Sequence, residues 1–247
     1  MREVRTRLRR EDIVYFADQA HVPYGDRAPG ELRMFLAHNL AFLESRDVDA
    51  VAMGCNTSCA IAARYGWPAT RMRIFDLIDA AAEAVVASNA RRVGVIATTA
   101  TATSGAYGAA IRSRAPAVQV QEVAAPALVP LVEAGVVEGP IARAAVAAAC
   151  ADFELPLDAL VLACTHYPLL DAHFAAVFGE NVRRVDPALA QAECAVTFAA
   201  QRGGERGTGR TLYVTSGELE PFKRAVASTC GPLGPNDLIE SVSLTIT

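Results

Sequence analysis

Two cysteines, Cys55 and Cys164, occupy the same kind of setting in the sequence. Each follows an apolar run of strand length and precedes residues that form hydrogen bonds readily. These residues are Asn56 and Thr57 after the first cysteine, and Thr165 and His166 after the second. Amide groups at a helix N-terminus stabilise a thiolate. Both cysteines are therefore candidates for acid–base or nucleophilic chemistry.

The apolar runs predict the elements that position these thiols. The stretch at residues 157–163 suits a parallel strand that is buried on both faces. Ligands of open α/β sheets bind just beyond the carboxyl ends of such strands. We therefore expect Cys164, Thr165 and His166 to lie at a binding edge of a sheet.

The two settings have matching spacings, which indicates an internal duplication. The step from Asp49 to Cys55 equals the step from Asp158 to Cys164. The likeness continues downstream, where three residues of the first copy are spaced like three of the second: Asp76, Glu83 and Val86, and Asp186, Glu193 and Val196. We interpret the repeat as a strand–Cys–helix–strand–helix unit. Two related halves would each present one thiol to a shared cleft.

Composition restricts the class of protein. The chain has 247 residues, of which 52% are hydrophobic and 20% charged, as in soluble globular proteins. A net charge of −4 gives no electrostatic footprint for nucleic acid. No apolar run approaches the ~20 residues of a membrane span. Six cysteines in a chain of this length do not form a dense secreted framework, so we expect a cytoplasmic protein with reduced thiols.

Strand and helix patterns alternate along the chain, which predicts an α/β fold with mainly parallel sheets. We expect a strand at residues 13–17, a Thr-, Ser- and Gly-rich turn at residues 98–105, and a helix at residues 187–201. The simplest partition places residues 89–187 in one lobe. Residues 1–88 together with 188–247 would form the other.

Three chemistries suit two cysteines and a histidine. Zinc could use Cys55, Cys59, Cys164 and His166, but compact paired ligand spacing is missing. A Cys–His nucleophile for acyl transfer needs one thiol and leaves Cys55 unexplained. The duplication favours a third chemistry, in which one thiolate removes a proton from a carbon and the opposing thiol supplies another, inverting the stereocentre. The other cysteines are expected to be buried structural residues: Cys59, Cys150, Cys194 and Cys230.

The two cysteine motifs carry a family resemblance. The sequence resembles the glutamate racemases of the cofactor-independent aspartate/glutamate racemase superfamily. The matching stretches are residues 54–57 (GCNT), 163–168 (ACTHYP), 22–25 (VPYG), 94–98 (GVIAT) and 128–133 (LVPLVE). The resemblance runs from about residue 11 to the C-terminus, and the two cysteine motifs together are specific to this group.

The resemblance implies two Rossmann-like lobes, related by internal pseudo-symmetry, with the active site between them. It makes Cys55 and Cys164 the two acid/base groups, assisted by His166 and Glu133 on the Cys164 side. It also implies a set of residues that contact the amino acid: Tyr24, Gly25, Asn56, Thr57, Thr165 and His166. Metal, pyridoxal and nicotinamide cofactors are not implied. The expected partner is glutamate, without nucleic acid or membrane, and the resemblance allows a homodimer.

The resemblance predicts interconversion of L- and D-glutamate, which supplies D-glutamate for peptidoglycan. The first residues depart from the family pattern, because members start with a strand that ends in Asp-Ser-Gly. Met1 lies instead within the helix that normally follows that strand. We therefore expect either a start upstream or a chain without this strand and its carboxylate beside Cys55. The alternatives are an aspartate or hydantoin racemase, or a truncated and catalytically weak homologue that binds a ligand or partner.

Overall fold

The computed structural model describes residues 1–154, 156–204 and 206–243, and its contacts divide the chain into two compact units. Unit 1 comprises Met1–Ala52, Trp67–Phe75 and Ala192–Thr247, and unit 2 comprises Met53–Gly66 and Asp76–Gln191. The fold is α/β with parallel sheets, as the alternating patterns predict.

The two units differ from the lobes expected from the sequence in residues 53–66, 76–88 and 188–191, all of which belong to unit 2. These segments pack within unit 2, because their helices lie against helices of that unit. Helices α3 (Asn56–Tyr65) and α4 (Leu77–Ala87) contact α6 (Ala106–Arg114), and α3 also contacts α5 (Thr99–Ser104).

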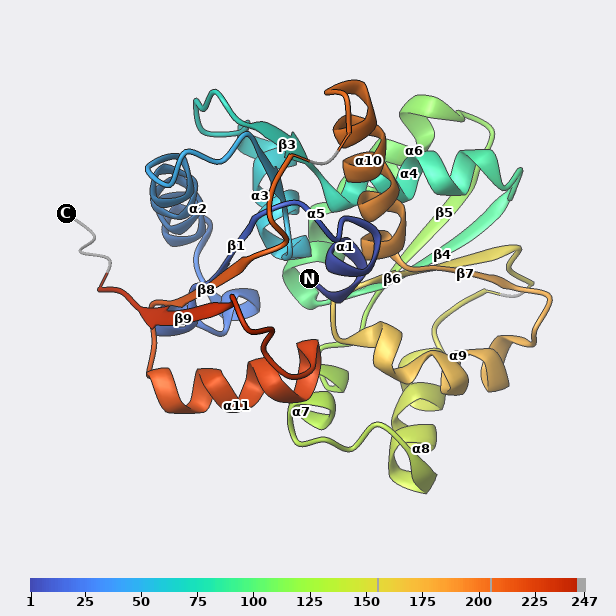
Figure 1. The fold of residues 1–247 in the computed structure, drawn as a ribbon. Helices are drawn as coiled ribbons and strands as arrows, with labels where there is room; N and C mark the ends of the chain where they lie inside the picture. Colours follow the sequence, from blue (N-terminus) through green and yellow to red (C-terminus); the bar gives the residue numbers. More distant parts are fainter. Residues whose placement is uncertain (155, 205, 244–247) are drawn as a thin grey trace. The chain divides into compact units, whose positions relative to one another are not determined.

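Unit 2 is built on one parallel sheet with the strand order β5–β4–β6–β7. The strands are β4 (Arg92–Ala97), β5 (Gln119–Ala124), β6 (Ala159–Ala163) and β7 (Arg183–Val185). Helices α4 and α6 lie on one side of this sheet, and α8 (Gly139–Ala149) and α9 (Asp171–Phe178) lie on the other (Figure 1). Every residue of β6 is buried, so the expected strand that leads to Cys164 is confirmed.

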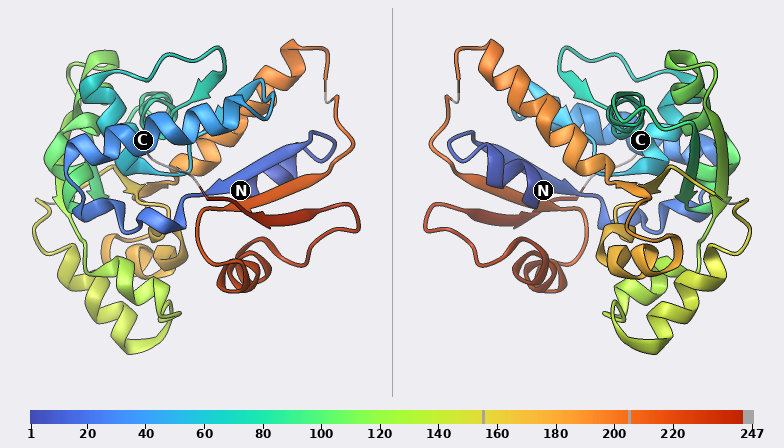
Figure 2. Two further views of the ribbon diagram at one scale, coloured as in Figure 1. Left: turned by 90° about the vertical axis from the view of Figure 1, so that its left-hand side faces the viewer. Right: turned by 90° about the vertical axis from the view of Figure 1, so that its right-hand side faces the viewer.

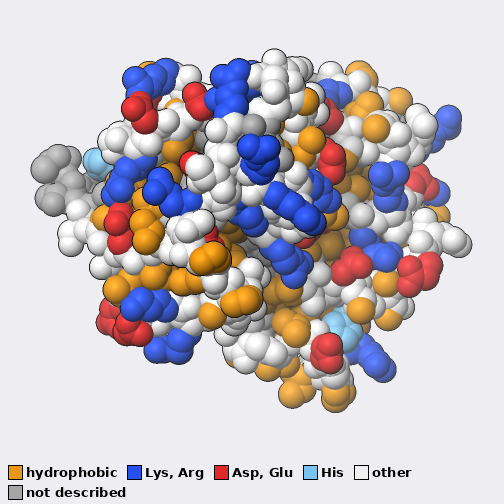
Figure 3. All heavy atoms as spheres, in the orientation of Figure 1, with side chains coloured by type: hydrophobic (Ala, Val, Ile, Leu, Met, Phe, Trp, Pro, Cys, Tyr) orange, Lys and Arg blue, Asp and Glu red, His pale blue; other side chains and the backbone are white. Residues whose placement is uncertain are grey.

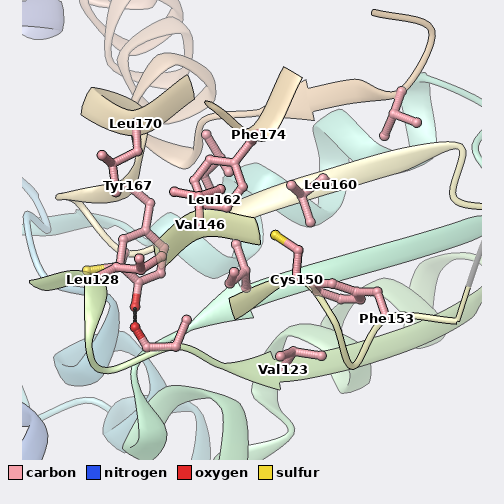
Figure 4. Close-up of a cluster of buried hydrophobic side chains, with 14 of the residues drawn as sticks. Val123, Leu128, Val146, Cys150, Phe153, Leu160, Leu162, Tyr167, Leu170 and Phe174 are labelled. Carbon is pink, nitrogen blue, oxygen red and sulfur yellow. Dashed lines mark hydrogen bonds between the residues drawn. The ribbon is translucent and has the colours of Figure 1, made fainter. Parts of the chain in front are cut away.

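The core of unit 2 forms where β6 meets the helices on one face of the sheet. Leu160 and Leu162 point from β6 toward Val146 of α8 and Phe174 of α9 (Figure 4). Leu128, from α7 (Leu128–Glu133), belongs to the same cluster. Burying a leucine side chain of this kind contributes about 1.5–3 kcal/mol. This packing holds the carboxyl end of β6 in place.

Unit 1 contains the parallel sheet β1–β8–β9, formed by β1 (Ile13–Ala17), β8 (Thr211–Thr215) and β9 (Leu238–Ser241). Helix α11 (Leu219–Cys230) packs on this sheet through Phe222 and Val226 (Figure 2). A second, two-stranded sheet pairs β2 (Ala50–Ala52) with β3 (Arg73–Phe75) in parallel.

The remaining helices of unit 1 are α1 (Arg2–Arg7) and α2 (Pro29–Glu44). Two short 3₁₀ turns, η1 (Gln19–His21) and η2 (Tyr24–Asp26), follow β1. Helix α10 (Pro187–Gln201) begins in unit 2 and continues into unit 1.

Charged side chains of both signs lie close together on the face seen in Figure 3. Arg7 forms ion pairs with Glu3 and Glu193, and Arg202 forms one with Asp49. Such pairs at the surface stabilise a fold by only about 0–1 kcal/mol each. Among the described residues, no helix has both the length and the apolar character required to cross a membrane.

Candidate active site

Cys164 directly follows the buried strand β6 and is itself only 6% exposed. Burial raises the pKa of its thiol to about 11. A charge on Cys55 or Glu133 acts in the same direction, while the backbone N–H groups of His166 and Tyr167 lower the pKa. The amide stabilisation expected from the sequence is present, but burial outweighs it. The thiol of Cys164 therefore holds its proton at neutral pH.

A chain of hydrogen bonds leads from Cys164 toward solvent. The Sγ atom of Cys164 lies 3.6 Å from Nδ1 of His166, and Nε2 of His166 lies 2.9 Å from Oε1 of Glu133. A neutral imidazole that donates from Nε2 to the carboxylate presents Nδ1 as an acceptor to the thiol. Glu133 is mostly exposed, with 65% of its side chain accessible. The arrangement can carry a proton to and from the Cys164 sulfur.

The turn after Cys164 sets the place of these groups. Residues Tyr167–Leu170 form the 3₁₀ turn η3, with Pro168 in its first positions. The Tyr167 side chain is fully buried and its hydroxyl donates to the carbonyl of Ala125 at 2.8 Å (Figure 4). This anchor leaves His166 half-buried and Thr165 exposed at the carboxyl end of β6.

Cys55 occupies the N-cap position of α3 with extended backbone and is half-buried. The next three residues, Asn56, Thr57 and Ser58, are buried polar residues in the first turn of α3. A cysteine at this place faces the unpaired amide groups of a helix N-terminus. The sequence expectation that a helix begins directly after Cys55 is confirmed.

Unit 2 brings the Cys55 segment to the same sheet edge as Cys164. Oγ1 of Thr57 lies 3.5 Å from Oγ1 of Thr98, which directly follows β4. Ala97 of β4 pairs with Ala163 of β6, so Thr98 and Cys164 are neighbours at the carboxyl ends of adjacent strands. The electrostatic effect of Cys55 on the pKa of Cys164 agrees with this proximity. The two thiol segments therefore converge on one edge, where open α/β sheets bind ligands.

Tyr24 and Gly25 belong to unit 1 and lie in the 3₁₀ turn η2. The hydroxyl of Tyr24 donates to Oδ2 of Asp18 at 2.5 Å and accepts from Nδ2 of Asn39 at 3.0 Å. Asp18 also accepts from Ser216 at 2.7 Å and contacts Nδ1 of His21 at 2.8 Å. These bonds lower the pKa of Asp18 against the opposing effect of burial. The phenol of Tyr24 is thus used to anchor its own loop.

The structure adds two residues that the sequence did not predict to belong to the site. Thr98 contacts Thr57, and the signal for it was available, because Thr98 also ends a buried strand at the binding edge. Tyr107, inside α6, donates to Oδ1 of Asn56, and only the folded structure reveals this contact. In the described part of the chain, no three His, Cys, Asp or Glu residues group as metal ligands would.

Comparison with known proteins agrees with this geometry. Residues 2–195 match the family model described as Asp/Glu/Hydantoin racemase. The chain belongs to the Asp/Glu/Hydantoin racemase family. A relative within this family, the glutamate racemase of Desulforudis audaxviator (strain MP104C), is 39% identical over 238 residues, which cover 92% of this chain and 87% of the relative. The resemblance drawn from the two cysteine motifs is therefore confirmed.

Solved structures extend the comparison within the racemase family. The chain superposes on the crystal structure of the glutamate racemase of Francisella tularensis subsp. tularensis SCHU S4 in complex with D-glutamate. The TM-score is 0.87 and the identity 27%, covering all (100%) of this chain and 93% of that chain. The aspartate racemase of Picrophilus torridus, 16% identical with a TM-score of 0.56 over 77% of this chain and 94% of that chain, shares the fold.

Proposed function

We propose that the protein is a cofactor-independent glutamate racemase that interconverts L- and D-glutamate with two thiols. The observation that supports it most is the convergence of the Cys55 and Cys164 segments on one sheet edge of unit 2. Glutamate is favoured as substrate because the relative from Desulforudis audaxviator is a glutamate racemase and the Francisella enzyme binds D-glutamate.

The reaction moves one proton off the α-carbon and another onto it. A thiolate on one face takes the α-proton, and the C–H electron pair remains on the carbon. The thiol on the opposite face then donates its proton to that pair, so a new C–H bond forms with inverted configuration. Cys164 begins as the donor in the free enzyme, because its raised pKa keeps it protonated. The two sulfurs exchange roles in the reverse direction.

The imidazole of His166 exchanges protons with the Cys164 sulfur. When Cys164 must act as the base, its proton leaves through Nδ1 of His166, the atom 3.6 Å from the sulfur. Glu133 orients the ring and stabilises the imidazolium through the Nε2 contact at 2.9 Å. The α-proton of an amino acid is a weak acid, so positioning and preorganised charges must supply much of the rate enhancement.

The substrate contacts proposed from the family pattern are the polar residues beside the two thiols and the Tyr24 loop. They are Asn56, Thr57, Thr165, His166, Tyr24 and Gly25. Because the Tyr24 hydroxyl already bonds to Asp18 and Asn39, we assign the contribution of this loop to its main chain rather than to the phenol. In the cell the product, D-glutamate, would enter peptidoglycan and so support the cell wall and cell shape. We expect the enzyme to work in the cytoplasm, where its six thiols stay reduced.

The experiment that tests this proposal follows the optical activity of each candidate substrate. Purified protein is given L-glutamate, D-glutamate, L-aspartate or a 5-substituted hydantoin, and racemisation is measured by circular dichroism. We expect kcat/KM for glutamate to exceed that for the other substrates at least about 100-fold, since the side-chain carboxylate of aspartate is one methylene closer to the α-carbon and a hydantoin has no free α-carboxylate or ammonium group. If aspartate or the hydantoin is turned over faster than glutamate, that compound and not glutamate is the substrate. A folded protein that binds glutamate without racemising it would be a binding homologue instead.

A further inference from the structure

Asn56 is held by a tyrosine, Tyr107, that lies outside the five matching stretches named above. The hydroxyl of Tyr107 donates a hydrogen bond to Oδ1 of Asn56. Tyr107 is 0% exposed and Asn56 is 5% exposed, so this bond is shielded from water. Helices α3 and α6, which carry the two residues, pack against each other. The bond therefore joins the residue next to Cys55 to a rigid helix of unit 2.

The direction of this bond fixes the orientation of the Asn56 amide. A phenol has a single proton, whereas a carboxamide has one acceptor oxygen and two N–H donors. If Nδ2 faced the hydroxyl instead, the phenol proton of Tyr107 would need another acceptor, and the hydroxyl has no other hydrogen-bond partner among the described residues. The Asn56 amide oxygen therefore already accepts a hydrogen bond from Tyr107. Both N–H donors of Nδ2 remain without a partner among the described residues.

The environment of Tyr107 keeps the phenol a permanent donor. Burial raises its pKa well above the ordinary value. Negative charge on the neighbouring Cys59, Asp76, Cys164 and Asp186 raises the pKa further. The hydroxyl therefore keeps its proton when a thiolate forms nearby, and the Asn56 amide keeps its orientation during the reaction.

We propose that Tyr107 is a positioning residue that fixes Asn56 as a donor to a carboxylate group of the amino-acid substrate. The proposal rests on the racemase function above and assigns the chemistry of one contact. If the Asn56 amide could rotate freely, its oxygen would face the substrate carboxylate part of the time. Both oxygens are hydrogen-bond acceptors, so they would repel each other. Tyr107 removes that arrangement before the substrate binds, so the gain is one of preorganisation.

The test is a double-mutant cycle with Tyr107→Phe and Asn56→Ala. Tyr107→Phe should raise KM for glutamate about 5- to 10-fold, which is the range expected for one neutral hydrogen bond, and change kcat less than about 2-fold. Asn56→Ala should raise KM at least about 10-fold. Adding Tyr107→Phe to Asn56→Ala should raise KM no further, because the phenol acts only through the amide.

The matched control is Tyr213→Phe, which removes the hydroxyl of another buried tyrosine, in unit 1. It should leave KM unchanged. An unchanged KM in Tyr107→Phe, with only a lower melting temperature, would overturn the proposal. Equal effects of Tyr107→Phe with and without the Asn56 side chain would overturn it too.

Calorimetric binding of D-glutamate separates this proposal from the function on which it rests. If the unaltered protein binds glutamate without racemising it, the racemase function fails, and the Kd values of the same variants decide the role of Tyr107. If the unaltered protein neither racemises nor binds glutamate, both proposals fail. A Kd that rises about 5- to 10-fold in Tyr107→Phe and not in Tyr213→Phe supports the positioning role.

Discussion

The two cysteine segments share a backbone plan that extends well beyond the thiols. In the first copy the N–H of Arg73 donates to the carbonyl of Asp49 at 3.0 Å, and in the second the N–H of Arg183 donates to that of Asp158 at 3.1 Å. The following helix begins in both copies with an aspartate that accepts a backbone N–H. Ile78 donates to Asp76 at 2.6 Å, and Ala188 donates to Asp186 at 2.8 Å.

The copies differ in what surrounds the sulfur. Cys55 is half-buried and followed by the regular helix α3, whereas Cys164 is buried and followed by the short turn η3. The strand before Cys164 is buried throughout, while Ala52 of β2 is exposed. His166 and Glu133 stand beside the second thiol. A duplicated backbone can thus place two identical groups and still give them different access to protons.

The largest effect should come from removing either thiol. Cys55→Ser and Cys164→Ser should each lower the rate of D/L interconversion at least about 1,000-fold, because a missing base leaves one face of the α-carbon without proton transfer. Circular dichroism of glutamate solutions measures the rate. Cys230→Ser, which changes the half-buried cysteine that ends α11 in unit 1, is the matched control and should keep full activity. Full activity in either site variant would exclude a two-base mechanism.

The imidazole beside Cys164 should matter next. His166→Asn removes the imidazole whose Nδ1 lies 3.6 Å from the sulfur and leaves an amide that cannot take up a proton, so we expect kcat to fall about 100-fold. The control is His173→Asn, which changes another histidine of unit 2 that contacts the carbonyl of Val137. Equal losses in the two variants would show that the decrease reflects folding rather than proton transfer.

The proton affinity of Cys164 should slow its alkylation. With a pKa of about 11, only about one in a thousand of its thiols is ionised at pH 8, and the sulfur is also buried. We expect iodoacetamide to modify Cys55 at least about 10-fold faster than Cys164, as followed by peptide mass spectrometry. Because the pKa is raised, the ultraviolet absorbance of the Cys164 thiolate should appear as the pH passes about 11. It should be missing in Cys164→Ser. If Cys164 is modified faster than Cys55, its thiol is not the more protected of the two.

Glu133 should have the smallest effect of the four. Its side chain is 65% exposed, so solvent weakens its interaction with the His166 imidazole. Glu133→Gln should lower kcat about 3- to 10-fold, and the difference should shrink at high salt. Glu138→Gln, an exposed change at the start of α8, should leave kcat unchanged. A loss as large as that of His166→Asn would mean that the carboxylate takes part directly in proton transfer.

Strong hydrophobic patterns made much of the fold predictable. The strand β1 and helix α10 have the predicted bounds, and β6 is buried on both faces as expected for a continuous apolar run. Residues 98–105, predicted as a turn, contain α5 instead. Threonines form helices poorly in isolation, but packing of α5 against α3 and β5 overrides that preference.

The site was predictable in its residue types but less so in its chemistry. The spacing after each apolar run placed the two thiol segments at a sheet edge. The sequence predicted that backbone amides stabilise the Cys164 thiolate. The raised pKa follows instead from burial of the thiol, which depends on helices that are far from Cys164 in the sequence. The hydrogen bonds of Tyr24 to Asp18 and Asn39 likewise depend on chain folding, since Asn39 lies in the next helix.

The unequal burial of Cys55 and Cys164 has a consequence for the kinetics of a racemase. L- and D-glutamate have the same free energy in water, so their equilibrium constant is unity. The ratio kcat/KM must then be equal in the two directions, whatever the state of either thiol. The difference between the sulfurs can therefore appear only in the saturated enzyme. The kcat values for L- and D-glutamate can differ, and the two KM values must then differ by the same factor.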